Sequence, residues 1–347
     1  MNRQGRAETA LWISSAPLRI SLAGGGTDVP SYADRFGGVV LGTTTDLRVT
    51  VVGRAGGASP VLRACLDTCA TAPSAEALPN PFARAALDRH WTGDPLQLTS
   101  FSAVAGGTGL GSSAAFCAAL IGGLTAARGG RHGGLRGMEL AEAAAGIETD
   151  ALNRPVGKQD QYLSVLGGFH ELRFGTDGTV EAEHLDVQPS VVRRLDEELL
   201  MFFTGVTRDA GAVLAAQGNR VGARDRETEA RLHEMKELTA VVRKALEGGD
   251  LCRLGEAMGR HWELKQGLSS KVTLPGVDRA YREALAAGAT GGKLLGAGGG
   301  GFLLLHVPAR AQSEVRGVVA AHGMTEQPFG LDDRGHEVHL LEGTAGR

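Results

Sequence analysis

The feature that most constrains this chain is its glycine, much of which is gathered into three loops. Glycine makes up 52 of the 347 residues, about twice its usual share in globular proteins. The glycine-rich loops span residues 24–26, 106–111 and 288–301. Because glycine has no Cβ, its backbone adopts positive φ easily and can approach a ligand or another backbone closely. Since no collagen-like period is present, we expect these glycines to form loops in a globular fold.

Length and charge limit the class of protein. A chain of 347 residues corresponds to about two domains. Its 42% hydrophobic and 22% charged residues exclude wholesale disorder. With 36 basic and 39 acidic side chains, the net charge is −3, so we expect no nucleic-acid or membrane partner. The sequence shows no apolar run suited to a membrane helix or a signal peptide, and we expect a cytoplasmic protein.

Hydrophobic periodicity predicts a mixture of strands and helices throughout the chain. Strands are expected over residues 18–22, 47–52, 96–101, 169–174, 180–185, 198–203, 302–307 and 337–341. Helices are expected over residues 112–127, 138–152, 224–248, 276–287 and 309–321. The mixture predicts an α+β protein of two domains. We place the boundary within 175–195 and take the domains as residues 1–185 and 186–347.

The cysteines suggest neither a metal site nor a disulfide framework. Cys65 and Cys69 are spaced C-x3-C, without a second pair and without a nearby histidine, and Cys117 and Cys252 stand alone. This spacing argues against a zinc site. We expect all four to be free thiols, as is usual in a reducing cytosol.

The second glycine-rich loop predicts an anion site. It runs from Gly106 directly into the helix expected to begin at Ser112. Loop amides, the free N–H groups of a first helical turn and the helix dipole together favour a bound phosphate. The hydroxyls of Ser112 and Ser113 could bind a phosphate oxygen or ligate Mg²⁺. The loop is not a Walker A motif, since no lysine follows it. The alternative is a loop that only caps a packed helix.

The other two glycine-rich loops are less specific. The first is followed by Thr27 and Asp28, which could bind sugar hydroxyls, although a strained turn with a helix N-cap at Asp28 is the alternative. In the third, Gly296, Gly298 and Gly301 match G-x-G-x-x-G. They lead into a strand and not into a helix, so we do not expect a dinucleotide fold. We expect this backbone to fold tightly against another loop.

Two acidic residues complete a possible catalytic set. Asp160 follows Lys158 in the segment 156–162, and Glu148 lies 12 residues before Asp160. Two carboxylates and a serine-rich helix start are the minimum set for phosphoryl transfer, because one acid can hold Mg²⁺ while the other handles the acceptor hydroxyl. The alternative for Lys158 is a surface salt bridge.

Taken together, these segments resemble the GHMP kinase superfamily, which includes galactokinase, homoserine kinase and mevalonate kinase. Its three motifs are matched, in order, by residues 16–28, 109–115 and 293–301. Within the superfamily the chain is similar to the D-glycero-D-manno-heptose 7-phosphate kinases, which share the Gly-Gly-Gly-Thr-Asp sequence and the segment 157–162. Residues 203–208 and 262–271 are also similar to that family. Fucose kinases share part of this set.

The resemblance implies a fold and a set of site residues. The fold would be an N-terminal domain like ribosomal protein S5 domain 2 and a ferredoxin-like C-terminal domain, with the active site between them. Asp160 and Arg19 would be catalytic, with Lys158 as a second candidate cation, and Ser113 and Glu148 would hold Mg²⁺. The phosphates of ATP would lie on Gly107, Gly109, Leu110, Gly111, Ser112, Ser113 and Ala114. The substrate would contact Gly25, Gly26, Thr27, Asp28 and Gly299, and its phosphate would contact Arg208 and Lys271.

The function that the resemblance implies is transfer of the γ-phosphoryl group of ATP to the anomeric hydroxyl of a heptose 7-phosphate, which gives a 1,7-bisphosphate. One alternative is a kinase for an unphosphorylated sugar such as fucose. Another is a non-catalytic nucleotide-binding regulator. A third, an NAD-binding oxidoreductase, is suggested by residues 296–301 alone. The expected partner is a small-molecule sugar phosphate, and the resemblance is compatible with a homodimer.

Overall fold

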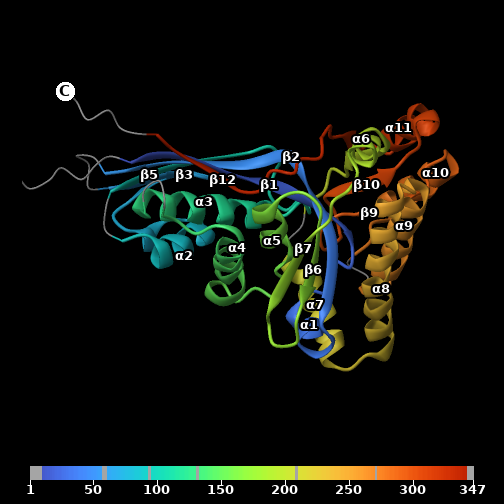
Figure 1. The fold of residues 1–347 in the computed structure, drawn as a ribbon, viewed down its shortest axis with the longest axis horizontal. Coiled ribbons are helices and arrows are strands. Elements are labelled where there is room, and N and C mark those ends of the chain that lie inside the picture. The colour runs from blue at the N-terminus through green and yellow to red at the C-terminus, as the bar shows by residue number, and fades with distance from the viewer. Residues whose placement is uncertain are drawn as a thin grey trace, which may run out of the picture.

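The fold is built on two β-sheets, seen in the computed structural model of Figure 1. The structure describes residues 10–56, 61–92, 95–129, 133–207, 210–269 and 272–341. One sheet has eight strands and the other has four. Within the described ranges, no helix combines the length and the apolar character needed to cross a membrane.

The larger sheet has the order β12-β1-β2-β5-β3-β4, with β6 and β7 attached through β2. Its strands are β1 (Leu11–Ala23), β2 (Gly38–Ala55), β3 (Leu62–Cys65), β4 (Cys69–Ala72), β5 (Leu96–Ser102), β6 (His170–Phe174), β7 (Val180–His184) and β12 (Glu337–Leu341). The long strand β2 pairs with β6 along its first part and with β5 along its last part. Pairing is antiparallel except between β3 and β5.

Helix α3 (Ser112–Gly129) packs on this sheet and contacts α2 (Pro81–His90) and α4 (Gly137–Gly146). Glycines inside α3 allow the close contact. A Cβ on Gly123 would lie 2.1 Å from the ring of Trp12, and one on Gly122 would lie 2.2 Å from His336. The two glycines that weaken the helix in isolation therefore let the buried Trp12 ring and the half-buried His336 ring pack against its backbone.

The smaller sheet has the order β11-β8-β10-β9. Its strands are β8 (Leu199–Phe203), β9 (Gly291–Leu294), β10 (Phe302–His306) and β11 (Thr325–Glu326). Side chains alternate along β10, so Leu303 and Leu305 face one core while Phe302 and Leu304 face the other. Helices around this sheet are α8 (Arg226–Gly248), α9 (Leu251–Gln266), α10 (Pro275–Ala286) and α11 (Gln312–Ala321).

Shorter elements connect these layers. They are α1 (Pro30–Phe36), α5 (Gln159–Leu166), α6 (Pro189–Glu198), α7 (Ala210–Gly222), a π-helical turn at Ile147–Ala151 and 3-10 turns at Ala75–Ala77 and Ala309–Ala311. Each strand and helix predicted from periodicity is present. Most have bounds close to those expected, but β1 and β2 begin at Leu11 and Gly38, well before the expected residues 18 and 47. The helix expected over 138–152 is α4 continued by the π-helical turn.

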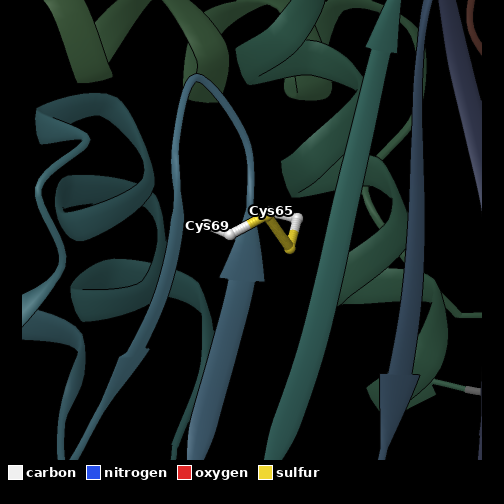
Figure 2. Close-up of a disulfide and its surroundings, with 2 residues drawn as sticks. All are labelled: Cys65 and Cys69. Atoms are coloured by element: carbon white, nitrogen blue, oxygen red, sulfur yellow. A yellow bond between two sulfur atoms is a disulfide. The ribbon is translucent and has the colours of Figure 1, made fainter.

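The expectation of four free thiols is wrong for one pair. Cys65 and Cys69 form a disulfide (Figure 2). They are opposite residues where β3 turns back into β4, with Cα atoms 3.9 Å apart. The C-x3-C spacing thus corresponds to a tight hairpin that brings the two thiols together. The expectation of free thiols, which rested on a reducing cytosol, did not consider such a hairpin. Cys117 and Cys252 are free, as expected.

The last strand joins the first sheet. β12 pairs with β1 in antiparallel register from Leu11–Leu341 to Ser15–Glu337, and Figure 1 shows it running along the larger sheet. The strand was expected from its sequence, but it lies within the range 186–347 that we assigned to the second domain.

Candidate active site

One pocket lies where the three glycine-rich loops meet. The N-terminal half of the chain contributes Arg19, Ser21, Gly25, Gly26, Asp28, Val29, Gly107, Gly109, Gly111, Ser112, Ser113, Glu148, Arg154, Val156, Gly157, Gln159, Asp160 and Gln161 to its lining. The C-terminal half contributes Leu214, Gln217, Lys265, Lys293, Leu295, Gly296, Ala297, Gly298 and Gly300. The pocket therefore contains most of the residues that the sequence singled out.

Arg19 and Asp160 form the central ion pair of the pocket. Arg19 projects from β1, and its Nε and Nη2 donate to Oδ1 and Oδ2 of Asp160 at 2.7 and 2.6 Å. Its Nη1 donates to the carbonyl of Gly109 at 2.6 Å. Asp160 lies in the first turn of α5. The buried guanidinium thus joins the acid to the loop 106–111 and fixes the orientation of its carboxylate.

The loop 106–111 has the geometry expected of a phosphate cradle. Gly107, Gly109 and Gly111 have positive φ, and the loop ends at the first turn of α3, where backbone N–H groups are free. Ser112 and Ser113 line the pocket beside these glycines. Leu110 and Ala114, which we also placed at the phosphates, have buried side chains and do not line the pocket.

The third glycine-rich loop folds against this cradle, as its sequence predicts. A Cβ on Gly301 would lie 2.2 Å from the carbonyl oxygen of Thr108, and one on Gly296 would lie 2.5 Å from the Cα of Gly109. The N–H of Phe302 donates to the same Thr108 carbonyl at 3.1 Å. Only glycine permits this contact between loops, which brings the second sheet up to the loop 106–111.

Glu148 lies beside the start of α3, at the π-helical turn after α4. Its Oε1 accepts hydrogen bonds from Ser113 Oγ and Gln161 Nε2, both at 3.0 Å, and its Oε2 accepts one from Arg154 at 3.2 Å. Burial raises the pKa of Glu148, and the Arg154 cation opposes that rise. The neighbouring oxygens of Ser113 and Glu148 fit the hard-donor set that Mg²⁺ prefers.

The first glycine-rich loop presents a buried carboxylate. Asp28 Oδ1 accepts from the N–H of Gly26 at 3.0 Å and from Gln159 Nε2 at 2.8 Å. Burial raises the pKa of Asp28, and the nearby Asp160 carboxylate adds to that effect. Thr27, which we expected at the substrate, instead directs its hydroxyl to the carbonyls of Gly24 and Val39. Thr27 therefore stabilises the conformation of the loop without lining the pocket.

Two further residues proposed from the sequence, Lys158 and Gly299, do not line the pocket. Lys158 forms an ion pair with Glu142 at 2.6 Å, and Gly299 donates its N–H to the carbonyl of Val272 at 2.7 Å. Arg208 and Lys271 lie outside the described residues.

Several pocket residues were missed from the sequence. Lys265 comes from α9, Lys293 from β9, and Gln217 from α7, where its Nε2 donates to the carbonyl of Gly26 at 2.9 Å. A signal was present for the two lysines. Lys265 falls on the apolar side of its helix with Leu254, Met258 and Trp262, and Lys293 lies inside a short buried strand.

The comparisons with known proteins agree with this geometry. Two family models match: GHMP kinases N terminal domain over residues 80–168, and GHMP kinases C terminal over residues 242–323. A D-glycero-alpha-D-manno-heptose 7-phosphate kinase from Campylobacter jejuni is 29% identical over 85% of this chain and 88% of its own length. A mevalonate kinase from Methanothermobacter thermautotrophicus is 30% identical over 64% of this chain and 68% of its own length.

The fold is also shared with solved structures. A D-glycero-D-manno-heptose 1-phosphate kinase from Bacteroides thetaiotaomicron matches with a TM-score of 0.76 at 23% identity, covering 96% of this chain and 100% of that one. A glycine-rich loop at a helix start, in one pocket with an acid held by an arginine, is the arrangement expected of a small-molecule kinase. The chain belongs to the GHMP kinase family, and it is an ATP-dependent phosphotransferase with an alcohol acceptor.

Membership of the GHMP kinase family also identifies the fold class. The predicted α+β arrangement, with an S5 domain 2-like first domain and a ferredoxin-like second domain, is confirmed as the two-domain GHMP kinase fold. The dinucleotide-binding alternative does not hold, because Gly296–Gly301 connects the strands β9 and β10 and opens no helix.

Proposed function

We propose that this kinase phosphorylates the anomeric hydroxyl of a heptose 7-phosphate and releases a heptose 1,7-bisphosphate and ADP. The observation that carries the proposal is the position of the Arg19–Asp160 pair. It lies in one pocket with the phosphate loop on one side and the loop 24–28 on the other. The similarity to a heptose 7-phosphate kinase over most of both chains supports the choice of acceptor.

In this proposal Asp160 orients the acceptor hydroxyl and takes its proton. The acceptor oxygen forms a bond to the γ-phosphorus, the bond from that phosphorus to the β,γ-bridging oxygen breaks, and ADP leaves with the electron pair. Both carboxylate oxygens already accept from Arg19, but each retains a further acceptor position. Because the transition state is loose, most of the acceleration comes from positioning and from cations near the transferred group.

Mg²⁺ fits beside Ser113 and Glu148, and when bound it would neutralise phosphate charge. Ser113 stands at the start of α3 and Glu148 faces it. Arg154 holds the second carboxylate oxygen and so fixes the orientation of the acid. We propose Ser113 and Glu148 as the protein ligands of this ion.

The proposed acceptor is tested by ADP release against a panel of sugars. The panel contains heptose 7-phosphates of different configuration, the corresponding free heptoses, and fucose. We expect ADP release only with a heptose 7-phosphate, and a product that carries phosphate at both ends. Turnover of free fucose or free heptose, with none for the phosphorylated sugar, would favour the alternative of an unphosphorylated acceptor. ATP binding without turnover on any sugar would favour a regulator.

A further inference from the structure

We propose that Lys265 and Lys293, which we call the lysine pair, form a subsite for a phosphoryl group on the α9 and β9 side of the pocket. The inference rests on the proposed function and refines it. The group could be the terminal phosphate of ATP or the phosphate that the acceptor already carries, and the experiment below separates these two sources.

The backbone brings the two lysines together. Helix α9 lies directly on β9, because a Cβ on Gly291 would be 2.0 Å from the carbonyl oxygen of Gly255. One turn further along α9, a Cβ on Gly259 would be 3.6 Å from the Cα of Gly291. Lys265 follows on the same helix and Lys293 follows on the same strand, and both line the pocket.

Both ammonium groups are buried and have bonding capacity to spare. Lys265 is 7% exposed and Lys293 is 1% exposed. Lys265 Nζ donates to the carbonyl of Gly296, and Lys293 Nζ donates to the carbonyl of Leu22 at 3.4 Å. An ammonium has three N–H donors, so each group has two left. Within the described part of the chain, neither lysine forms an ion pair with a carboxylate.

The nearest acids are already engaged. Asp160 and Asp28 both act on Lys265 electrostatically, but Asp160 is held by Arg19 and Asp28 by Gln159. Burying an unpaired cation is costly, and neither lysine has a carboxylate partner among the described residues. A bound dianion would supply the missing partner. The hydroxyl of Ser21, which lines the same pocket, is buried and has no partner among the described residues, so it can donate to the same anion.

Protonation of the pair depends on its surroundings. Burial lowers the pKa of Lys265 to about 8, and the Arg19 cation adds to this effect. Burial lowers the pKa of Lys293 well below its usual range, and the Lys265 and Arg19 cations contribute. A phosphoryl dianion bound between these groups would raise both pKa values again. Binding at pH 8 should therefore take up protons, which calorimetry in buffers of different ionisation enthalpy measures directly.

The test compares Lys265→Met and Lys293→Met with Lys244→Met, whose lysine is exposed on α8. Calorimetry gives the affinity of each variant for ATP, ADP, heptose 7-phosphate and free heptose. If the pair holds the terminal phosphate, affinity for ATP falls by about tenfold or more while affinity for ADP is unchanged. If it holds the acceptor phosphate, the preference for heptose 7-phosphate over free heptose falls by a similar factor. Either result supports the subsite.

Folded variants that bind all four ligands within about twofold of the unsubstituted enzyme would overturn the proposal. Should a methionine variant fail to fold, proton uptake by the unsubstituted enzyme decides the question, because its absence for both ATP and the sugar phosphate overturns the subsite. The outcome is separable from that of the proposed function. If the enzyme phosphorylates only free sugars, the proposal of a heptose 7-phosphate as acceptor is refuted. The comparison of ATP with ADP affinity still tests whether the lysine pair binds a phosphoryl group.

Discussion

Gly157 lies against the carboxylate of Asp28, so that a Cβ at position 157 would come within 1.8 Å of Oδ2. The same carboxylate oxygen accepts the backbone N–H of Gln159 at 3.2 Å. The segment that carries Asp160 is therefore fitted directly onto the loop that carries Asp28. Asp28 and Asp160 are therefore held in a fixed relation by backbone contacts.

Replacing Gly157 with alanine should displace Asp28. We expect the KM for the acceptor to rise by about tenfold or more, since hydrogen bonds to a charged group are lost, with little change in the affinity for ATP. Steady-state kinetics with each substrate varied in turn measures this. Gly317→Ala is the matched control, because a Cβ there meets nothing within 4 Å. An unchanged acceptor KM in Gly157→Ala would contradict the assignment of Asp28 to acceptor binding.

Asp160→Asn should lower kcat by about a hundredfold or more while leaving ATP affinity nearly unchanged, because the amide cannot take the acceptor proton. The change also leaves Arg19 without a countercharge, so thermal unfolding should be measured alongside. The control is Asp88→Asn, at an exposed position on α2. A folded Asp160→Asn enzyme with near-normal kcat would end the assignment of Asp160 as the base.

Ser113→Ala should raise the Mg²⁺ concentration needed for half-maximal activity by about tenfold, because one proposed ligand is lost. Glu148 retains its hydrogen bonds from Gln161 and Arg154, so the rest of this cluster should persist. Titration of activity with Mg²⁺ at saturating ATP measures the change, with Ser190→Ala on α6 as an exposed control. An identical metal titration for Ser113→Ala would count against ligation.

The pH profile should show an alkaline limb. Lys265 has a pKa lowered to about 8, so it is charged below that pH and binds an anion there, and it becomes neutral as the pH rises. We expect kcat/KM for ATP or for the sugar phosphate to fall by about tenfold per pH unit above the limb. The charged and titratable groups that face Lys265 are Arg19, Asp28, Asp160, His261 and Lys293.

The variant Lys265→Met identifies the origin of that limb. Its kcat/KM should be low and flat over the range in which the unsubstituted enzyme declines. His261 does not contribute to the alkaline limb of kcat/KM, because burial lowers its pKa well below the usual range and it stays neutral throughout. An undiminished alkaline limb in Lys265→Met would assign the titration to another group.

Much of the fold was predictable because it depends on local patterns. Alternating apolar and polar residues marked β5, the turn at residues 176–178 marked the hairpin β6–β7, and an apolar stripe from Leu232 to Leu246 marked α8. The close packing of the third glycine-rich loop was also predictable from its sequence. Glycine is required at positions 296 and 301 by contacts that no other residue tolerates. The convergence of the three glycine-rich loops in one pocket followed from the family resemblance and not from the pattern alone.

The structural features that could not be predicted from the sequence depend on long-range packing. Nothing local in residues 337–341 specifies β1 as their partner, and the Cys65–Cys69 bond requires the hairpin that places the two residues opposite each other. The position of Lys265 in the pocket depends on the packing of α9 on β9, which the sequence of the helix does not specify. The predicted roles of Lys158 and Thr27 drew on motif position, whereas their side chains bond to Glu142 and to loop carbonyls.

The pairing of β12 with β1 has a consequence for synthesis. Residues 11–15 are translated long before their outer neighbour, which is made from residues 337–341. β1 therefore presents an unpaired edge until residues 337–341 have been translated, and such edges recruit other strands. A chain cut short before residue 337 should leave that edge open and should be prone to aggregation, even though every residue of the pocket would already have been made.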